Sequence, residues 1–518
     1  MRASLSLLAA IATSTVAQRV VPLSFSRQGP RQNTVTRRAA TYSEELNNNL
    51  TGGGYYADVA LGTPPQSVTL ILDTGSSDVW VLDTDADLCQ SRALQNYYGD
   101  CLATYDPSKS STYSLVDQDG FSIKYVDSSG AEGDYIKDAF HIGGASIEAL
   151  QVGLAKNSTI NSGLLGIGFD TNVAADRPYR NIMDLFVDQG LIDSQAYSLY
   201  LDDLYAETGT ILFGGLDTKK YIGDLKAIDI VPDAQTKTYS SFTVALSSFT
   251  ITSENKSNSE NYLLSAIPVV LDSGTTLTYL PLKIANQIYE AFNAFDDTEN
   301  TGLVYVSCSL LSDQKGTTFD FQFGGDSGPL IRVPVDEMIL DNVKGFIDLG
   351  LQLPDLPFED ACSFGIQSLS GYYLLGDTFL RSAYVVYDLS NKQIALAQAN
   401  LNSTESNVVE ITNSTGIPLV SGVASQASVT QTATGLPGTG GHSKTTNEAT
   451  SAATTSAATS AATSTATSAP TVTVTSIPSG SASGNAAARA VPALNWEAVT
   501  VTLVTAFFSL AGASLLVR

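Results

Sequence analysis

The amino-acid sequence predicts a mainly all-β fold, and three observations support this prediction. Short runs rich in Val, Ile, Thr, Tyr and Phe, such as YYADVAL, SVTLIL and AYVVYDL, recur between Gly, Asp, Ser and Pro across residues 39–402. Strands do not alternate with helices, which argues against a doubly wound α/β fold. Only the segments around residues 182–186 and 284–292 stand out by a helical spacing of apolar residues. An internal repeat then divides the β-rich region into two similar halves.

The first 38 residues have the features of segments that are removed during secretion. A basic residue, an apolar run and a final small residue predict a signal peptide over residues 1–17, too short to span a bilayer. Residues 18–38 are basic and end in Arg37-Arg38, a pair that a furin-like processing protease would cut. We therefore expect a pro-segment over residues 18–38. The alternative is an incidental Arg-Arg pair in a leader.

Four cysteines and two histidines restrict the chemistry of the chain. Four cysteines allow three pairings, and the short separation of Cys89 from Cys101 predicts a local clip, which leaves Cys308 with Cys362. Such bonds fit an oxidising compartment. The scarcity of histidine argues against a His-based metal site and against a Ser-His-Asp triad. We expect neither a metal nor another cofactor.

The composition changes sharply after residue 402. Ser, Thr and Ala dominate residues 403–485, which cannot bury enough apolar surface to fold alone and are typical of an O-glycosylated stalk. Small residues, a spacer and a terminal apolar run then form a glycolipid-anchor signal. We expect attachment at Asn485 and removal of residues 486–518. A plain transmembrane tail is the alternative.

Charge and glycosylation motifs add to this description of a secreted protein. The 518 residues carry 52 acidic and 27 basic side chains, a formal net charge of -25 that would repel nucleic acid. The excess of acids suits a protein that works at low pH, although it can also serve solubility alone. Sequons for N-glycosylation occur at Asn49, Asn157, Asn255, Asn402 and Asn413.

The internal repeat brings two aspartates into the same local sequence. An apolar strand leads into Asp73 in LILDTGSSDVW and into Asp272 in VVLDSGTTLTYL. At similar distances beyond them, residues 164–166 and 374–376 each consist of two leucines and a glycine. One Asp-Thr-Gly is an ordinary turn signal. Two copies of this motif, each followed at a similar distance by a Leu-Leu-Gly segment, indicate a pair of functional carboxylates.

On these motifs the chain resembles the pepsin-like aspartic proteases between Tyr55 and Asn400. The stalk and the tail make it most similar to the glycolipid-anchored fungal members, the yapsins and their relatives. The resemblance implies a bilobal fold with a central cleft, with lobes over residues 39–225 and 226–402. It also implies a monomeric endopeptidase that acts on polypeptides and is held on the extracellular face of the membrane, or in the cell wall.

The resemblance assigns roles to the residues of the two loops. The two aspartates would share one proton and activate a water between them. Gly75 and Gly274 would let the backbone approach the substrate. The supporting residues would be Thr74 and Ser273, which brace the loops against each other, and Ser76 and Thr275, which hydrogen-bond the outer carboxylate oxygens.

A second resemblance concerns the segment FSIKYVDSSGAEGDY, which is similar to the flap hairpin that closes over the substrate. It makes Tyr125 the flap tyrosine, and Trp80 resembles the tryptophan that hydrogen-bonds it. Without the resemblance both aromatics would be ordinary strand and core residues. The flap departs from the common pattern because Val126-Asp127 follows the tyrosine where a glycine is usual.

Acidic residues around the expected cleft suggest a preference for basic substrates. The yapsin-type enzymes have such a preference, and a solvated acidic loop is the alternative. The rival function is a non-catalytic cell-wall glycoprotein that keeps the fold as a scaffold, but both aspartates and both loop glycines are intact. The acids in question are Asp83, Asp85, Asp87, Asp127, Glu132 and Asp134.

Overall fold

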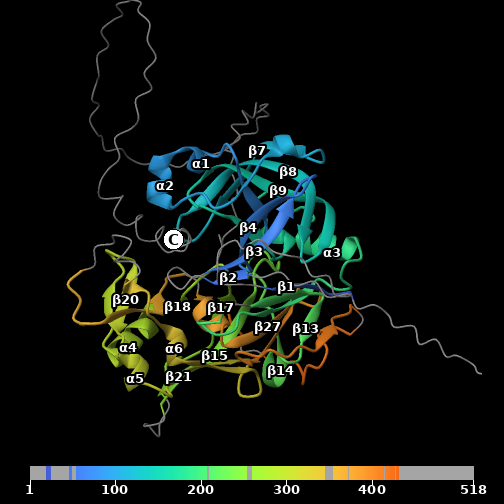
Figure 1. Cartoon of the computed structure of the whole chain (residues 1–518). Helices are drawn as coiled ribbons and strands as arrows, with labels where there is room; N and C mark the ends of the chain where they lie inside the picture. The colour runs from blue at the N-terminus through green and yellow to red at the C-terminus, as the bar shows by residue number, and fades with distance from the viewer. Residues whose placement is uncertain are drawn as a thin grey trace, which may run out of the picture.

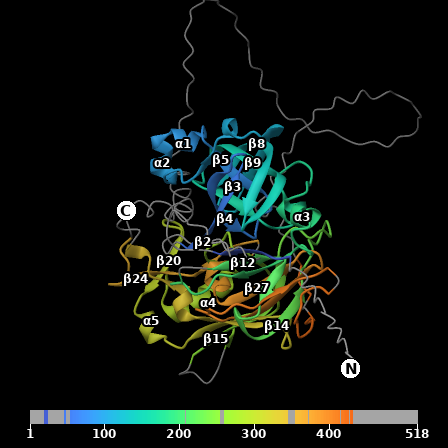
Figure 2. The ribbon, with the colours of Figure 1, turned by 45° about the vertical axis from the view of Figure 1, so that its right-hand side comes forward.

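The structure is a computed structural model, and it describes most of the β-rich region (Figure 1). Figure 1 shows two lobes, an upper one coloured blue to teal and a lower one coloured green to orange; the same two lobes are seen after a 45° turn in Figure 2. The mainly β fold is thus confirmed. The described residues are 19–24, 46–48, 54–206, 209–253, 260–344, 354–371, 373–413, 415–425 and 428–430.

The upper lobe is a nine-stranded sheet with three helices. Its strands alternate between buried and partly exposed positions, as the period of a half-buried strand requires. The strands are β2 (Leu46–Asn48), β3 (Tyr55–Leu61), β4 (Gln66–Asp73), β5 (Val79–Asp83), β6 (Thr104–Tyr105), β7 (Ser114–Lys124), β8 (Gly130–Ile142), β9 (Ala145–Ser158) and β10 (Gly163–Gly166). The helices are α1 (Asp87–Gln90), α2 (Arg92–Tyr98) and α3 (Ile182–Asp188), with short 3-10 turns at Pro107–Lys109 and Asp170–Asn172.

A six-stranded sheet combines strands from both halves of the chain, in the order β1-β12-β11-β27-β28-β14. One face of it packs into the main core, and the other face forms a second apolar cluster. The boundary predicted after residue 225 falls within β14 of this sheet. The strands are β1 (Val21–Ser24), β11 (Ala196–Tyr200), β12 (Thr210–Phe213), β14 (Tyr221–Asp229), β27 (Ala383–Asp388) and β28 (Gln393–Ala399).

The lower lobe contains an eight-stranded and a four-stranded sheet. The eight-stranded sheet consists of β15 (Thr243–Thr252), β16 (Glu260–Asn261), β17 (Ile267–Leu271), β18 (Thr278–Leu280), β21 (Thr318–Phe323), β22 (Leu330–Pro334), β25 (Ile366–Ser368) and β26 (Leu374–Leu375). The four-stranded sheet consists of β19 (Phe295–Asp297), β20 (Leu303–Ser307), β23 (Ile339–Leu340) and β24 (Ala361–Phe364). The helices are α4 (Leu282–Phe292), α5 (Leu310–Asp313), α6 (Val335–Met338) and α8 (Asp377–Leu380).

Both helices expected from the apolar spacing are present, as α3 and α4. α3 begins with a capping box, in which the Asn181 side chain accepts from the first turn and the Asp184 carboxylate accepts from the Asn181 amide. α4 buries Ile284, Ile288 and Phe292 along one face.

The sequence repeat corresponds to a structural repeat. In the upper lobe β10 runs parallel to β4 and places Gly166 opposite Asp73. In the lower lobe β26 runs parallel to β17 and places Leu375 opposite Leu271, the residue before Asp272. Asp73 therefore ends β4 and Asp272 directly follows β17, and each of these strands pairs with the Leu-Leu-Gly element of its own half.

Both expected disulfides are confirmed. Cys89 and Cys101 are joined at 2.03 Å, which ties α1 to the chain just after α2. Cys308 and Cys362 are joined at 1.99 Å and link the chain just after β20 to β24. Each lobe thus contains one disulfide, and the one in the lower lobe reaches the core through the fully buried Cys362.

Packed structure continues past residue 402, where the sequence predicts the stalk to begin. β29 (Val408–Glu410) pairs with β13 (Gly215–Asp217), and Ile411 is fully buried in the cluster on the outer face of the six-stranded sheet. Within the described part of the chain, no helix is long and apolar enough to cross a membrane. The signal peptide, Asn485 and the terminal apolar run lie outside the described residues.

Candidate active site

Two loops bring Asp73 and Asp272 together between the lobes. Both side chains are buried, with 3% and 4% of their surface exposed. Each loop folds its own backbone onto its aspartate: the Gly75 N–H donates to Asp73 Oδ1 at 2.8 Å, and the Gly274 N–H donates to Asp272 Oδ1 at 2.9 Å. The two carboxylates are therefore held in matching orientations by residues two positions further on.

The outer oxygens of the carboxylates are also hydrogen-bonded. The Ser76 hydroxyl donates to Asp73 Oδ2, and the Thr275 hydroxyl donates to Asp272 Oδ2 at 2.6 Å. These bonds fix the rotation of each carboxyl group. The arrangement is the one expected for these two hydroxyls from the sequence.

Thr74 and Ser273 lock the two loops to each other across the lobes. The Thr74 hydroxyl accepts from the Ser273 N–H at 2.9 Å and donates to the Leu271 carbonyl at 3.0 Å. The Ser273 hydroxyl accepts from the Thr74 N–H at 3.2 Å and donates to the Leu72 carbonyl at 3.0 Å. All four backbone groups are buried, so these bonds replace the water that the groups lose on folding. Serine in place of threonine at residue 273 keeps the full set.

Gly75 and Gly274 allow the two loops to approach. A Cβ atom built on Gly75 would lie 2.6 Å from Asp272 Oδ1, and one on Gly274 would lie even closer to Asp73 Oδ1. Each glycine therefore lies against the aspartate of the other loop. Any side chain at either position would push the two carboxylates apart.

The environment of the pair favours a retained proton. Burial, followed by the negative charge of Asp272, raises the pKa of Asp73 above its usual range, although hydrogen bonds from Ser76 and Gly75 act in the opposite direction. Two adjacent buried carboxylates cannot both ionise cheaply. Over the acid range the pair can thus hold one proton and one negative charge, which supplies an acid and a base at the same place.

The hairpin of β7 and β8 carries Tyr125 at its tip. Trp80 Nε1 donates to the Tyr125 hydroxyl at 2.9 Å, the hydrogen bond expected from the resemblance. The tip closes with Ser128 in the left-handed region at φ 70°, while Asp127 Oδ1 accepts from the Ser129 N–H at 2.9 Å. Ser128 thus adopts the turn conformation for which a glycine is usual, and the Asp127 carboxylate stabilises the turn.

The predicted cluster of acids is only partly available to a substrate. Asp134 is buried and bonded to Lys156 Nζ at 2.8 Å. Asp87 Oδ1 accepts from the Ser158 N–H at 3.1 Å, and so helps to join α1 to β9. Asp85 is exposed, and Asp83 is half-buried with a pKa raised mainly by burial.

Asp127 is the predicted acid whose charge influences a residue of the opposite lobe. It lies on the flap tip of the upper lobe, while Tyr279 lies on β18 of the lower lobe. Burial, together with the negative charge of Asp127, raises the pKa of the Tyr279 phenol to about 12. The Asp127 carboxylate therefore acts on groups of the opposite lobe. Glu132 is exposed on β8.

A buried carboxyl that the sequence analysis missed lies behind the Asp73 loop. Asp78 is fully buried and accepts from the hydroxyls of Tyr135 at 2.8 Å and Tyr179 at 2.7 Å, and from the Ala174 N–H at 2.6 Å. Burial raises its pKa. The three donors come from β8 and from the loop before α3, so Asp78 ties both to the base of the loop. An acid directly before the apolar run VWVL was the signal available in the sequence.

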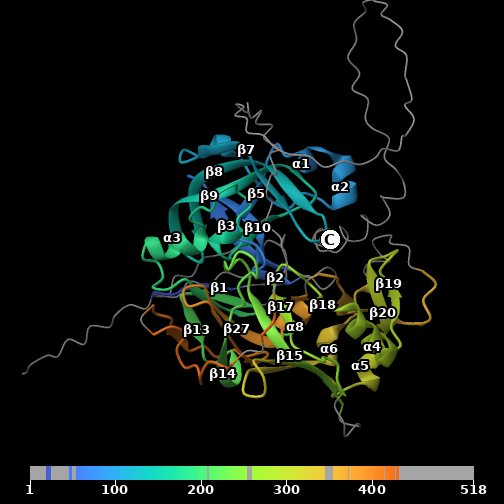
Figure 3. The ribbon, with the colours of Figure 1, turned by 180° about the vertical axis from the view of Figure 1, so that it is seen from behind.

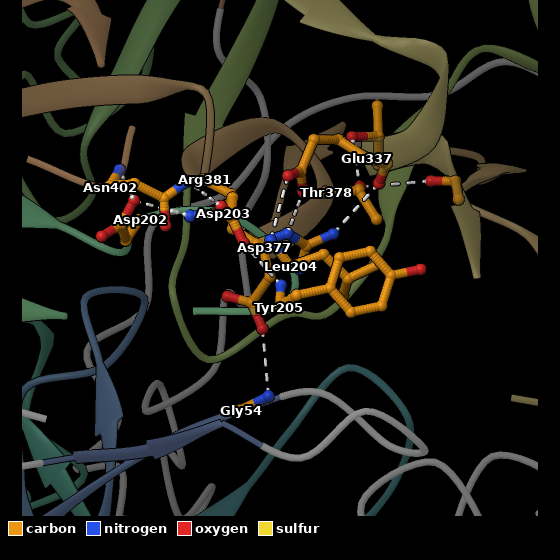
Figure 4. A network of polar contacts seen from close by, with 12 residues as sticks. Gly54, Asp202, Asp203, Leu204, Tyr205, Glu337, Asp377, Thr378, Arg381 and Asn402 are labelled. Atoms are coloured by element: carbon orange, nitrogen blue, oxygen red, sulfur yellow. Dashed lines mark hydrogen bonds and ion pairs between the residues drawn. The ribbon is translucent and has the colours of Figure 1, made fainter. Parts of the chain in front are cut away.

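A second unpredicted network connects distant segments beside the dyad (Figure 4). Asp377 Oδ2 accepts from the Gly54 N–H at 3.0 Å, which joins the start of β3 to α8. Arg381 pairs with the Glu337 carboxylate and donates from Nη2 to the Glu337 carbonyl at 3.0 Å. Glu337 Oε1 also accepts from the Leu204 N–H at 3.0 Å. The network therefore links four chain segments, those around Gly54, Leu204, Glu337 and Arg381, through buried charges.

These buried carboxyls predict that the protein loses stability as the pH rises. Burial raises the pKa of Asp377 to about 8, although Arg381 and the Gly54 N–H lower it. In the unfolded chain the group titrates near 3.8. Its stabilising contribution is therefore complete below about pH 4 and is lost as the pH rises through about 8, by up to about 1.4 kcal/mol per pH unit.

The test is denaturant unfolding between pH 4 and 8 of the wild type and of Asp377→Asn, whose amide oxygen can still accept from Gly54. We expect the free energy of unfolding of the variant to fall less steeply with rising pH than that of the wild type. The difference in slope should be up to about 1.4 kcal/mol per pH unit, which corresponds to one proton. The exposed Asp326→Asn serves as the matched control. Identical slopes in the wild type and Asp377→Asn would show that Asp377 is not the titrating group.

The sequons fall partly within the described residues. Asn157, on β9, is exposed. Asn402 and Asn413 are also exposed, but their side-chain amides already donate to the Asp203 carboxylate and to the Asp193 carbonyl, respectively. Asn49 and Asn255 lie outside the described residues.

Comparison with known proteins gives consistent results. A relative from Aspergillus oryzae, described as "Probable aspartic-type endopeptidase opsB", is 42% identical over 387 residues, which cover 72% of this chain and 74% of the relative. "Secreted aspartic protease 3" of Candida albicans is 34% identical over 360 residues, 69% of this chain and 82% of that protein. The crystal structure of an aspartic proteinase from Irpex lacteus shares the fold with a TM-score of 0.54 at 22% identity, covering 70% of this chain and 98% of that one.

The family match covers the two lobes and both aspartate loops. The model of the eukaryotic aspartyl proteases matches residues 54–399, which begin just before β3 and end with β28. The paired loops, their mutual hydrogen bonds and the buried carboxyl pair lie within these residues. The chain belongs to the eukaryotic aspartyl protease family and is an aspartic-type endopeptidase.

Proposed function

We propose that the protein is an acid-active endopeptidase of the cell surface in which Asp73 and Asp272 carry out the hydrolysis. The observation that carries this proposal is the pair of buried carboxyl groups, each held by two hydrogen bonds from its own loop. The mutual locking of Thr74 and Ser273 keeps the pair aligned.

The proposed reaction needs only these carboxyls and one water. The ionised carboxylate takes a proton from the water, which attacks the peptide carbonyl, while the protonated carboxyl donates to the carbonyl oxygen. The C–N bond of the tetrahedral intermediate then breaks: the carboxyl that took the proton from the water delivers it to the nitrogen, which leaves as an amine, while a hydroxyl of the intermediate returns its proton to the other carboxylate. We assign the proton to the pair and not to one member, because the two groups titrate together.

Tyr125 is proposed as the flap residue that covers the substrate. Its hydroxyl is held by Trp80 Nε1 at 2.9 Å, which keeps the ring oriented at the tip of the β7–β8 hairpin. Gly75 and Gly274 would serve the substrate by letting the two loops approach, because each glycine lies against the carboxylate of the other loop. Flap closure would exclude bulk water and strengthen the hydrogen bonds to the developing charge.

The location is proposed from the two ends of the chain. The leader, the sequons and the Ser/Thr-rich segment fit secretion, and a relative bears the printed name of a secreted protease. The terminal signal fits a glycolipid anchor at Asn485, which would hold the enzyme at the extracellular face of the membrane or pass it to the wall. Residues 403–485 would act as the stalk.

The proposed substrate preference is for Lys or Arg beside the cleaved bond. Asp127 lies on the flap and acts on the opposite lobe, and Asp83 and Asp85 add negative charge at the end of β5. A partly desolvated contact between a carboxylate and a substrate ammonium contributes about 1–3 kcal/mol. Such a contact corresponds to about one to two decades in kcat/KM.

We expect a peptide library to show cleavage beside basic residues and rejection of acidic ones. Asp127→Asn, and the triple change of Asp83, Asp85 and Asp87 to Asn, should each reduce the basic preference while cleavage of neutral sites continues. The charge-matched control is the triple change of Asp313, Asp326 and Asp336 to Asn, all exposed in the lower lobe. A wild type that prefers large apolar residues on both sides would exclude the proposed preference.

The scaffold alternative makes the opposite prediction for the same library. A non-catalytic wall glycoprotein would cleave no peptide at any pH, whatever the charge of the sequence. The intact carboxyl pair and its intact hydrogen bonds favour the enzyme.

Release of the protein from cells by a phospholipase would separate the anchored form from one with a transmembrane tail.

A further inference from the structure

A segment beyond the family match is packed on the folded protein, although the match itself ends at residue 399. We call residues 403–413 and 415–425 the clasp; its first half contains β29, which pairs antiparallel with β13. Figures 1 and 3 show this orange segment beside β13 from the front and from behind. The sequence predicts a stalk over these residues, so their packing needs an explanation of its own.

A buried carboxylate on β13 fastens the first half of the clasp. Asp217 is 3% exposed, and it accepts from the Ser406 hydroxyl at 2.6 Å and from the Asn407 N–H at 2.8 Å. Further along, the Ile411 N–H donates to the Gly214 carbonyl at 2.8 Å. Without the clasp, Asp217 would lose two hydrogen bonds that water could not readily replace at a buried site.

The second half of the clasp pairs with the edge strand β14. In the order β1-β12-β11-β27-β28-β14 this strand is terminal, so its outer edge offers backbone groups to a further strand. The Ala227 N–H donates to the Gly422 carbonyl at 3.2 Å, and the Ala227 carbonyl accepts from the Ala424 N–H at 2.8 Å. The Ser421 N–H donates to the Leu225 carbonyl at 3.0 Å. The clasp thus covers an edge that would otherwise be open to another chain.

Between these two attachments the clasp covers the outer face of the six-stranded sheet. Ile411 has no exposed surface and Ile417 only 8%. Both belong to the apolar cluster of this face, together with sheet residues such as Leu216, Leu225 and Tyr384. Removal of the clasp would therefore expose a continuous apolar surface, and such surfaces promote association.

The covered face lies on the side of the sheet opposite the dyad. Side chains alternate along β27: Tyr384 and Val386 belong to the cluster under the clasp, whereas Val385 and Tyr387 belong to the main core. Burial, and to a smaller extent the negative charge of Asp272, raises the pKa of Tyr387 on the inner face. The clasp therefore supports the sheet from the side away from the dyad.

We propose that the clasp is part of the enzyme itself: it completes the folded unit, and only a cut beyond it releases a stable soluble enzyme from the cell surface. The stalk of the proposed function then begins after residue 425. The statement on release rests on the proposed cell-surface location, whereas the structural role of the clasp does not. The competing view is that residues 403–425 belong to the stalk and can be lost without consequence.

The first test is Ile411→Asp in the full chain, with Leu419→Asp as the matched control because Leu419 lies on the same clasp but is 62% exposed. An Asp73→Asn background prevents self-digestion. Since a buried carboxylate without a partner is costly, we expect Ile411→Asp to lower the Tm by roughly 5–10 °C. Leu419→Asp should stay within about 1 °C of its parent. Equal Tm values in the two variants would overturn the proposal.

Hydrogen exchange of the same proteins locates the effect. In the parent, the amides of Ile411, Ser421 and Ala424 each donate to a backbone carbonyl outside the clasp. We expect them to exchange at least about 100-fold more slowly than amides of an unstructured chain. Ile411→Asp should remove this protection, and Leu419→Asp should keep it. Fast exchange in the parent would show that the clasp is not seated on the sheet.

The release step is tested with the recognition site of a sequence-specific protease, placed beyond the clasp in place of residues 436–441 or within it after Asn413. Each cut protein is compared with its own uncut form. A cut beyond the clasp should leave the Tm unchanged and, with the native dyad, the kcat/KM as well. A cut within the clasp removes the covalent link to its second half, which lowers the local concentration of that half, and should lower the Tm.

These outcomes separate the proposal from the proposed function. An unchanged Tm after both cuts would overturn the role of the clasp, whatever the activity. An enzyme that cleaves no peptide, but whose Tm and hydrogen exchange respond as expected, would refute only the catalytic assignment.

Discussion

Asp73→Asn and Asp272→Asn are each expected to lower kcat/KM for peptide hydrolysis by at least about 10³–10⁴-fold, because acid–base catalysis supplies gains of about 10²–10⁴ and the water also loses its activation. An amide can neither take the proton of the water nor share a proton with the remaining carboxyl. The N–H of Gly75 or Gly274 can still donate to the amide oxygen, and the hydroxyl of Ser76 or Thr275, which is also an acceptor, can turn to accept from the new NH₂ group. The fold should therefore survive either change.

The stability of these variants is part of the same prediction. Burial raises the pKa of Asp73, so the carboxyl destabilises the folded protein as the pH rises towards neutrality. Asp73→Asn removes this titration and should melt no lower than the wild type near neutral pH. The exposed Asp313→Asn serves as control for both activity and Tm. Near wild-type turnover by either dyad variant, free of contaminating protease, would refute the assignment of the pair.

The site could be predicted from the sequence wherever its contacts are local. Asp73 and Asp272 each bond to residues two and three positions further on, so one short motif specifies both the acid and its hydrogen bonds. The duplication of the motif then specifies the pairing of the lobes. The same reasoning holds for Cys89 and Cys101, which are separated by only 12 residues.

The remaining features depend on contacts that no local pattern records. The amide of Gly54 reaches Asp377 over a separation of 323 residues, and Ala174 reaches Asp78 over 96. Because residues 18–38 are basic, the sequence predicts a removable leader there. The alternating apolar residues Val21 and Leu23 were therefore not recognised as part of a strand. A lone arginine in the apolar stretch after Asp377 was the signal for a buried ion pair, because arginine is rarely buried unless it is paired.

Arg381→Met is expected to destabilise the folded protein by about 3–5 kcal/mol, the usual cost of removing one partner of a buried ion pair. Arg381 and Glu337 are 2% and 4% exposed, so the remaining carboxylate would have no water to replace its partner. Burial already raises the pKa of Glu337, and Arg381 is the main group that opposes this shift. The loss should thus be larger near pH 6 than near pH 3, where Glu337 can take up a proton.

A second change distinguishes an unpaired charge from a packing defect. Arg381→Met with Glu337→Gln removes both charges but keeps an oxygen that can accept from the Leu204 N–H. The double variant should recover most of the lost stability and should lose the extra pH dependence, because no buried carboxylate remains at residue 337.

Arg180→Met is the surface control: Arg180 pairs with Asp188 but is 57% exposed, and such pairs contribute about 1 kcal/mol or less. The measurement is urea unfolding, at pH 3 and pH 6, of the wild type, Arg381→Met, the double variant and Arg180→Met. Equal losses for Arg381→Met and Arg180→Met, or no recovery in the double variant, would show that the ion pair beside the dyad does not hold these segments together.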